Sequence, residues 1–175
     1  MDLEIGSGEN PQPGYLHTDI YVDDRNRHLV DIVCDAHCLP FGNACFDSIL
    51  MFGVFEHFGF YEIQIVMLEV CRVLKKGGVF KFDVPDFDWF LEIYRTGIDP
   101  NTRQPVDPNK NTDWALSWIF RWQRQNWDFH RWGWNEVRLR KFLEKPNWEF
   151  STVTLVGRQW RDPEANHLIY ECIKG

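Results

Sequence analysis

Phe46-Asp47-Ser48-Ile49-Leu50-Met51-Phe52 is a nearly all-apolar run that sets the class of fold. A short run of this composition predicts a strand with both faces covered, as in a parallel sheet packed between helices. Apolar residues then recur at helical spacing over 61–74, and another apolar run covers 79–84. Gly77 and Gly78 lie between these two segments and favour the end of the helix. Strand, helix and strand in this order indicate two parallel strands joined by a helical crossover.

Further elements are predicted on both sides of this unit. Short strands are expected before it, over 3–5, 15–20 and 29–34. Helices are expected after it, over 88–94, 113–125 and 135–143, and two last strands over 151–156 and 167–173. The sequence therefore predicts an α/β fold in one domain, with a mostly parallel sheet, helices on both faces and a C-terminal antiparallel hairpin. Because Pro11 and Pro13 deny a regular helix, the first crossover is expected to be shortened.

The composition excludes several classes of protein. The 175 residues hold 26 acidic and 19 basic side chains, a net charge of −7, which argues against general nucleic-acid binding. The five cysteines form no Cys-x-x-Cys pair, so neither a zinc pattern nor any other metal site is expected. The sequence holds no long apolar run and no leader-like segment, so we expect no membrane span and a cytoplasmic location.

Glycines and acids follow the predicted strands. In an open α/β sheet, ligands bind outside the carboxyl ends of the strands. The residues there are Gly6-Ser7-Gly8, Asp19, Asp35, Gly53 to His57, and Asp86 with Asp88. Glycines let a ligand approach the backbone, and acids accept hydrogen bonds from sugar hydroxyls or an exocyclic amine. This combination predicts an adenosine-containing ligand, but Pro11 stands where a dinucleotide-binding loop has its third glycine, which argues against NAD.

Four sequence blocks, in order, carry a resemblance to a known family. They are Leu3 to Gly8 (a glycine loop), Asp35 to Phe41 (D-x-x-x-L-P-F), Phe46 to His57 (F-D-x-I…E-H) and Glu69 to Gly78 (E-x-x-R-V-L-K-x-G-G). Together they resemble class I S-adenosylmethionine (SAM)-dependent methyltransferases of the ubiquinone/menaquinone type, the methyltransferase type 11-like group that acts on small molecules. The resemblance implies a Rossmann-like sheet, SAM as cofactor and S-adenosylhomocysteine as product.

The resemblance also implies a set of cofactor-binding residues, which are Gly6, Ser7, Gly8, Asp19, Asp35, Ala36, Phe52 and Gly53. The glycine loop would hold the methionine part of SAM, and Asp19 would bind the ribose hydroxyls. Asp35 would accept a hydrogen bond from the adenine amine with Ala36 beside it. Phe52 and Gly53 would lie near the sulfonium. Because Asp19 follows Gly8 by only 11 residues, Asp23 or Asp24 stays an alternative ribose ligand.

Tryptophan marks the opposite part of the chain. Residues 1–84, the cofactor-binding half, hold no Trp, while residues 85–134 hold seven of the nine. This Trp-rich insertion is expected to form the acceptor pocket or a lid, and residues 135–175 to form the last helix and strand pair. Ordinary packing and a contact between two copies of the chain are the alternatives. Trp114, Trp118 and Trp122 recur every four residues, on one face of a helix.

The expected reaction is methyl transfer by in-line displacement to a small-molecule or carbohydrate-like acceptor, at oxygen or nitrogen. A hydroxyl acceptor needs a general base, and the sequence offers His130 first, then His57 and Asp86. The alternative is an inactive methyltransferase-like module that binds SAM or a partner. Methylation of base amino groups is disfavoured, because Phe52-Gly53-Val54-Phe55 replaces the Asn/Asp-Pro-Pro-Tyr/Phe motif of such enzymes.

Overall fold

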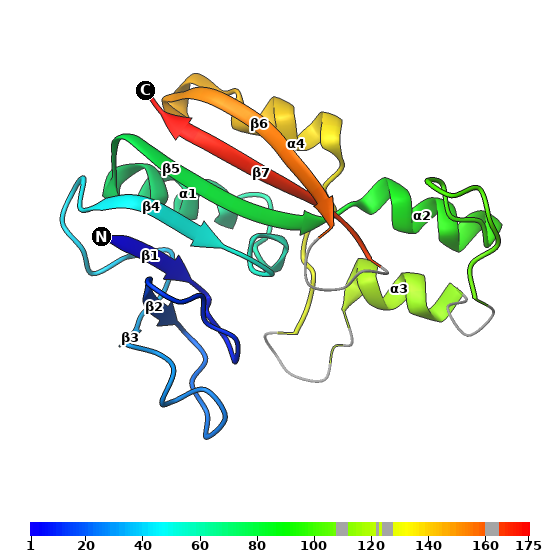
Figure 1. The fold of residues 1–175 in the computed structure, drawn as a ribbon, viewed down its shortest axis with the longest axis horizontal. Coiled ribbons are helices and arrows are strands. Elements are labelled where there is room, and N and C mark those ends of the chain that lie inside the picture. Colours follow the sequence, from blue (N-terminus) through cyan, green and yellow to red (C-terminus); the bar gives the residue numbers. More distant parts are fainter. Residues whose placement is uncertain (108–111, 122, 124–127, 160–164) are drawn as a thin grey trace.

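The computed structural model describes residues 1–107, 112–121, 123, 128–159 and 165–175, which are built around one sheet (Figure 1). Its strands are β1 (Asp2–Ile5), β2 (Leu16–Asp19), β3 (Ile32–Val33), β4 (Phe46–Met51), β5 (Leu74–Pro85), β6 (Phe150–Gln159) and β7 (Asn166–Lys174). The order across the sheet is β3-β2-β1-β4-β5-β7-β6. β7 runs antiparallel to both of its neighbours, and the other pairs are parallel. The predicted α/β class, with a mostly parallel sheet and a C-terminal antiparallel hairpin, is confirmed.

The helices of the described residues fall into two groups. They are α1 (Glu62–Val73), α2 (Phe87–Thr96), α3 (Thr112–Phe120) and α4 (Glu136–Leu143), with 3-10 turns η1 (Phe55–His57) and η2 (Pro146–Trp148). α1 and α4 lie against the sheet, whereas α2 and α3 lie beyond the carboxyl ends of β4 and β5 (Figure 1). The predicted cap of α4 is confirmed, since the Asn135 side chain accepts a hydrogen bond from the Arg138 N–H.

The main core fills the space between the sheet and these two sheet-bound helices. Alternate strand residues such as Ile49, Phe82 and Tyr170 join one buried cluster with Val66 of α1 and Phe142 of α4. Because side chains alternate between the faces of a strand, this shared cluster places α1 and α4 on the same face. Burial of this continuous apolar layer is the main source of stability of the domain.

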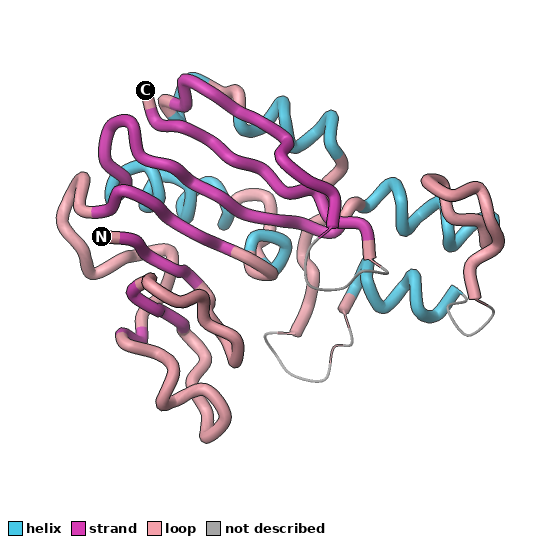
Figure 2. The backbone as a smooth tube through the Cα atoms, viewed as in Figure 1, coloured by secondary structure: helices cyan, strands magenta, loops and turns pink. Residues whose placement is uncertain are grey.

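The opposite face of the sheet carries no helix in the described residues, although helices on both faces were expected. The segments that join β1 to β2, β2 to β3 and β3 to β4 are loops (Figure 2). They are 10 to 12 residues long and rich in Pro, Gly, Asp and Asn, which favour turns over helices. This face carries a small apolar cluster, in which Leu50, Phe52 and Ile169 pack with Tyr15. The expected shortening of the first crossover is confirmed, and it extends to the next two.

Three element boundaries differ from the sequence-based prediction. The helix expected over 113–125 ends at Phe120, and the next residue, Arg121, has a φ of 63°, outside the helical region. The strand expected over 29–34 is reduced to Ile32–Val33. The Asp31 N–H still donates to the His17 carbonyl at 2.9 Å, but the Asp31 carboxylate takes up the His17 N–H at 2.8 Å. The helix expected over 61–74 is confirmed as α1, but the strand expected over 79–84 begins at Leu74, which pairs with Phe46 in the sheet. Strand pairing starts here before the glycines, so local stop signals did not set the helix end.

α2 and α3 form a second, smaller core of their own. Trp89, Phe90 and Ile93 of α2 are buried with Ala115 of α3. The Trp118 ring stacks on Phe90 with centroids 5.5 Å apart. The tryptophan face of the insertion therefore packs helix on helix at the carboxyl edge, in keeping with the packing alternative, while Trp122 and Trp127 lie outside the described residues.

Arg72 explains why the E-x-x-R block and the L-P-F block occur together. Its guanidinium donates to the carbonyls of Leu39 and Phe41 at 3.0 and 2.7 Å, and it pairs with Glu69 at 2.7 Å. Glu69 in turn accepts from the Leu39 N–H at 2.7 Å. The two residues of α1 thus satisfy the backbone of the loop that follows Asp35.

We expect Arg72→Met to lower the free energy of unfolding by about 2 kcal/mol, because several charge-assisted hydrogen bonds are lost at once. Urea denaturation followed by circular dichroism measures this. The matched control is Arg140→Met, which removes an exposed i,i+4 pair with Glu144 at 3.4 Å and should change stability little. Equal effects of the two substitutions would contradict the bridging role of Arg72.

Candidate functional site

The glycine loop is tied to the end of β2. The N–H groups of Gly6 and Ser7 both donate to the Thr18 carbonyl, at 2.8 and 3.0 Å. The Gly8 N–H donates to Oδ2 of Asp19 at 2.9 Å. Gly6 and Gly8 have φ values of 72° and 58°, a region that favours glycine. The structure therefore brings the predicted loop and Asp19 together.

The space around this loop fits a cofactor. A Cβ added to Gly8 or to Gly53 would meet no heavy atom within 4 Å, so both backbones border open space. The Ser7 hydroxyl is buried, yet it has no hydrogen-bond partner among the described residues. A buried hydroxyl of this kind is costly unless a ligand or water satisfies it. Gly6 differs, because its missing Cβ makes room for the Val54 side chain.

Asp19 keeps room for further hydrogen bonds beside the glycine loop. Its carboxylate lies beside the loop, and it accepts one hydrogen bond on each oxygen, from Gly8 and from Tyr21. A carboxylate offers about four acceptor positions, so capacity remains for hydroxyl donors. Asp23 instead pairs with the Arg25 guanidinium at 2.6 Å in the turn beyond β2.

Asp35 and Ala36 follow β3 as predicted. Oδ1 of Asp35 lies 2.9 Å from the His37 N–H and 2.6 Å from His37 Nδ1. Burial acts to raise the pKa of Asp35, but the hydrogen bonds and charge of His37 outweigh it and lower the pKa overall. Asp35 is therefore an ionised acceptor at neutral pH, as binding of an exocyclic amine requires. Ala36 is buried beside it.

Asp83 of β5 organises the end of β4. It is fully buried and accepts from the Gly53 N–H at 2.7 Å, while its other oxygen lies 2.7 Å from His167 Nδ1. Phe52, just before Gly53, packs into the cluster of the helix-free face. Sequence reasoning missed Asp83, and the available signal was an acid inside the otherwise apolar strand over 79–84.

A buried titratable cluster lies at the same edge of the sheet. Glu56 and His57 belong to η1, directly after β4, and His130 comes from the segment before α4. His130 Nε2 is 3.7 Å from Oε1 of Glu56, and the rings of His57 and His130 meet edge to face at 5.0 Å. The side chains of Glu56 and His130 are each 5% exposed. The structure thus joins the two predicted histidines and adds Glu56.

The environment shifts the pKa values of this cluster in opposite directions. Burial, with the negative charge of Asp83, raises the pKa of Glu56 to about 8. Burial, with the neighbouring His57, lowers the pKa of His130 to about 3. Desolvation disfavours the charged form of each group, which accounts for both directions. His130 is therefore neutral across the physiological range.

Asp86 is held by other residues. Its Oδ2 lies 3.3 Å from the Arg158 guanidinium and 3.1 Å from the Asn166 amide, both from the C-terminal hairpin. Burial raises its pKa, and Arg158 opposes that effect. The contacts of Asp86 tie α2 to β6 and β7, and its role as a base stays a prediction.

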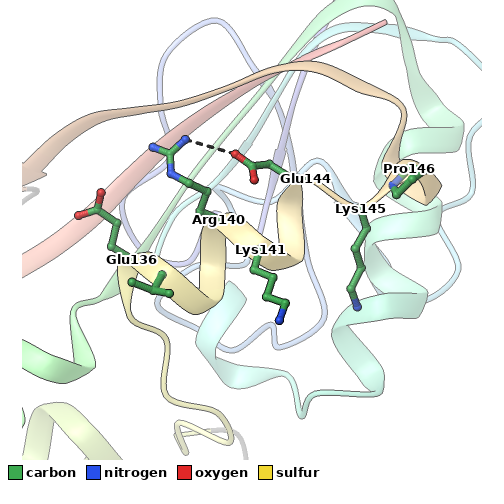
Figure 3. Close-up of a pocket in the computed structure, with 7 residues that line it drawn as sticks. Glu136, Arg140, Lys141, Glu144, Lys145 and Pro146 are labelled. Atoms are coloured by element: carbon green, nitrogen blue, oxygen red, sulfur yellow. Dashed lines mark hydrogen bonds and ion pairs between the residues drawn. The ribbon is translucent and has the colours of Figure 1, made fainter.

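One surface depression lies away from this edge. It encloses about 770 Å³ on the outer side of α4 (Figure 3). Its lining residues are Glu136, Val137, Arg140, Lys141, Glu144, Lys145 and Pro146. Because charged side chains of one helix line it and none of the predicted site residues does, it is not the candidate site.

Comparisons with known proteins agree with the resemblance that the sequence carries. Residues 3–82 match the methyltransferase domain family. The chain is 40% identical over 65 residues to a tRNA (carboxymethyluridine(34)-5-O)-methyltransferase of Xenopus tropicalis, covering 31% of this chain and 10% of that protein. It is 36% identical over 73 residues to a ubiquinone/menaquinone biosynthesis C-methyltransferase of Xylella fastidiosa, covering 38% and 27%. A SAM-dependent methyltransferase of Thermotoga maritima, described as a possible histamine N-methyltransferase, superposes with a TM-score of 0.62 at 15% identity, covering 99% of this chain and 82% of that chain.

The chain thus has an α/β fold that is similar to the fold of methyltransferases. In particular, residues 3–82 match the methyltransferase domain family, and the resemblance to class I SAM-dependent methyltransferases is confirmed. SAM is the cofactor that this family indicates. The matched segments cover 10% and 27% of the length of the two curated relatives. The solved structure, at 15% identity, supports the fold alone. No helix in the described part of the chain is long and apolar enough to cross a membrane.

Proposed function

We propose that this chain transfers a methyl group from SAM to oxygen or nitrogen of a small-molecule or carbohydrate-like acceptor. The observation that carries the proposal is the cradle at the carboxyl edge: open space at Gly8 and Gly53 and the partnerless Ser7 hydroxyl. Asp19 flanks the loop, and Asp35 supplies an ionised acceptor after the next strand. These are the donors and acceptors that an adenosine and an amino acid part would meet.

When bound, SAM supplies an activated methyl group on a leaving sulfur that becomes neutral. The chain therefore has to orient the acceptor in line and exclude water, which is mainly a matter of positioning. In this proposal, Gly53 and Asp83 shape the floor of the site, and the Trp-rich insertion closes its acceptor side. Trp118 supports this placement, because its carbonyl is 2.7 Å from His130 Nδ1.

The cluster of Glu56, His57 and His130 is the proposed acceptor-side group. A base works best with a pKa near the working pH. The low pKa of His130 makes it a weak base, which favours its use as a neutral ligand over its use as a proton acceptor. His57, second in the sequence-based ranking, then becomes the leading base, and Asp86 stays a less favoured candidate.

The first experiment is calorimetric titration with SAM and S-adenosylhomocysteine. We expect Asp35→Ala to weaken SAM binding about tenfold, the size of one lost charge-assisted hydrogen bond. Glu144→Ala, on the far side of α4, is the carboxylate control and should bind as the parent does. Asp19→Ala and Asp24→Ala, compared side by side, test the ribose assignment. No heat from SAM in a folded parent protein would overturn the proposal.

A second candidate is an inactive methyltransferase-like module that binds SAM or a partner. Two features favour this function. One face of the sheet carries no helix in the described residues, and loops replace the helical crossovers between β1 and β2, β2 and β3, and β3 and β4. Turnover of labelled SAM with an acceptor panel separates the two functions. Because one relative is named for a modified uridine in tRNA, the panel includes tRNA beside phenols, amines and sugars. Transfer to tRNA alone would contradict the small-molecule acceptor and the expectation, from the net charge, of no general nucleic-acid binding.

A further inference from the structure

We propose that Glu56, His57 and His130 form a binding site for one divalent transition-metal ion. The site lies at the carboxyl edge of the sheet, on the side of the Trp-rich insertion. One ligand-capable atom from each residue lies within 4.8 Å of the other two. Residues 56 and 57 come from η1 and residue 130 from the far side of the insertion, so folding alone assembles the group. The metal-binding inference stands on this cluster, and its role toward the acceptor rests on the proposed function.

The three ligand-capable atoms lie farther apart than they would around a bound ion. Metal-ligand distances for His nitrogen and Glu oxygen are about 2.0–2.2 Å, so neighbouring ligands of a tetrahedral ion are about 3.4 Å apart. Atoms that lie within 4.8 Å of one another therefore have to approach by up to about 1.4 Å when an ion enters. His57 is partly exposed, which gives the ion a route into a group otherwise closed to solvent.

Both histidines are oriented as metal-binding histidines are. Nδ1 of His57 lies 2.8 Å from the Phe129 carbonyl, and Nδ1 of His130 lies 2.7 Å from the Trp118 carbonyl. A carbonyl accepts only, so each Nδ1 carries the proton and each Nε2 carries a lone pair. An N–H donated to a backbone carbonyl is the usual second partner of a metal-bound imidazole, because it fixes the ring and the tautomer.

Glu56 supplies an independent observation that points to a ligand. Glu56 is 3% exposed, and its Oε2 atom has no hydrogen-bond partner among the described residues. Fully buried Asp83 lies near enough to add a second negative charge to its surroundings. A buried carboxylate oxygen without a partner is costly, and a divalent cation would satisfy it.

The donor set selects the kind of ion. Two imidazole nitrogens and one carboxylate suit Zn²⁺, Fe²⁺, Co²⁺ or Mn²⁺ better than Mg²⁺ or Ca²⁺, which prefer oxygen ligands. Three protein ligands also leave coordination positions open. An acceptor hydroxyl or amine could occupy one of them and be held in line with the cofactor, in which case His57 and His130 serve as ligands and not as bases.

The test is titration of the metal-free protein with Co²⁺, followed by visible absorption and calorimetry. We expect one ion per chain, with ligand-field bands and without the near-ultraviolet band of a cobalt thiolate. Glu56→Gln should weaken binding by about 100-fold or more, since loss of outer partners alone costs about 10–100-fold. His28→Ala and Cys38→Ser, at an exposed histidine and an exposed thiol, are the controls and should bind as the parent does.

Thermal unfolding keeps the test sharp. Glu56→Gln removes a buried acidic group, so without metal it should fold at least as well as the parent, and Zn²⁺ should raise the melting temperature of the parent only. His57→Asn, at a partly exposed position, gives a second variant that is expected to fold. Metal binding unchanged in both folded variants, or lost in Cys38→Ser, would overturn the proposal.

SAM titration of the same variants separates the two proposals. If Glu56→Gln loses Co²⁺ and keeps SAM binding, the metal site and the cofactor site are distinct, as inferred. If the parent binds Co²⁺ through the cluster but no SAM, the proposed function fails and the metal site stands. If the folded parent binds SAM but no Co²⁺ or Zn²⁺, the metal site fails alone.

Discussion

Trp134→Ala is expected to lower the free energy of unfolding by about 3–5 kcal/mol, the usual loss when a large aromatic leaves a core. Trp134 is 2% exposed. Its ring meets those of Phe55, Phe60 and Phe142 at centroid distances of 5.6, 6.5 and 5.2 Å. It therefore joins η1, the loop before α1 and α4 into one aromatic layer, and its removal would leave a cavity among these rings.

Two control substitutions separate packing from hydrogen bonding. Nε1 of Trp134 has no partner among the described residues, so Trp134→Phe gives up contact area but no hydrogen bond. We expect it to cost less than half as much as the alanine variant. Tyr61→Ala, at an 81% exposed ring, should change stability little. Urea denaturation followed by circular dichroism measures the free energy of unfolding of each variant. Equal losses of stability in Trp134→Ala and Trp134→Phe would contradict the view that packing sets the loss.

Asp83→Ala is expected to lower the free energy of unfolding by about 2–4 kcal/mol, because a buried ring and a partly buried N–H lose their acceptor at once. Those donors are the Gly53 N–H and the His167 ring. The same change should weaken SAM binding, since the proposed cofactor floor includes Gly53. Asp83→Asn keeps one oxygen acceptor but places an NH₂ group opposite the second partner. We therefore expect a loss of stability between that of Asp83→Ala and none.

The control for Asp83 is an acid of the same type at the surface. Asp47 is 57% exposed and pairs with Lys75 and the N-terminus, and such pairs contribute little in water. Asp47→Ala should therefore leave both stability and SAM affinity close to the parent values. Denaturation and calorimetry on the same preparations measure both quantities. An Asp83 variant no less stable than the Asp47 variant would show that the buried acceptor is dispensable.

The cofactor edge could be predicted because its residues stand at strand ends. Gly8, Asp19 and Asp35 each follow a predicted strand, and parallel strands bring their carboxyl ends to one edge. The same logic located the residues after β4. It gave no reason to join Glu56 to His130, since 74 residues and an irregular insertion separate them. It also ranked His130 as a base, because burial and the neighbouring His57 are not visible in a sequence.

Local sequence, then, determined the α/β class with its mostly parallel sheet, the glycine loop and the acids beside it. Hydrophobic periodicity and turn residues act over a few positions, so they can be read from the sequence alone. Only the tertiary structure decided which face the helices cover and where the tryptophans pack. It also decided which buried acids and histidines meet, namely Asp83 with His167 and Glu56 with His130. These pairings depend on desolvation and on contacts between distant segments, and both exist only once the chain has folded.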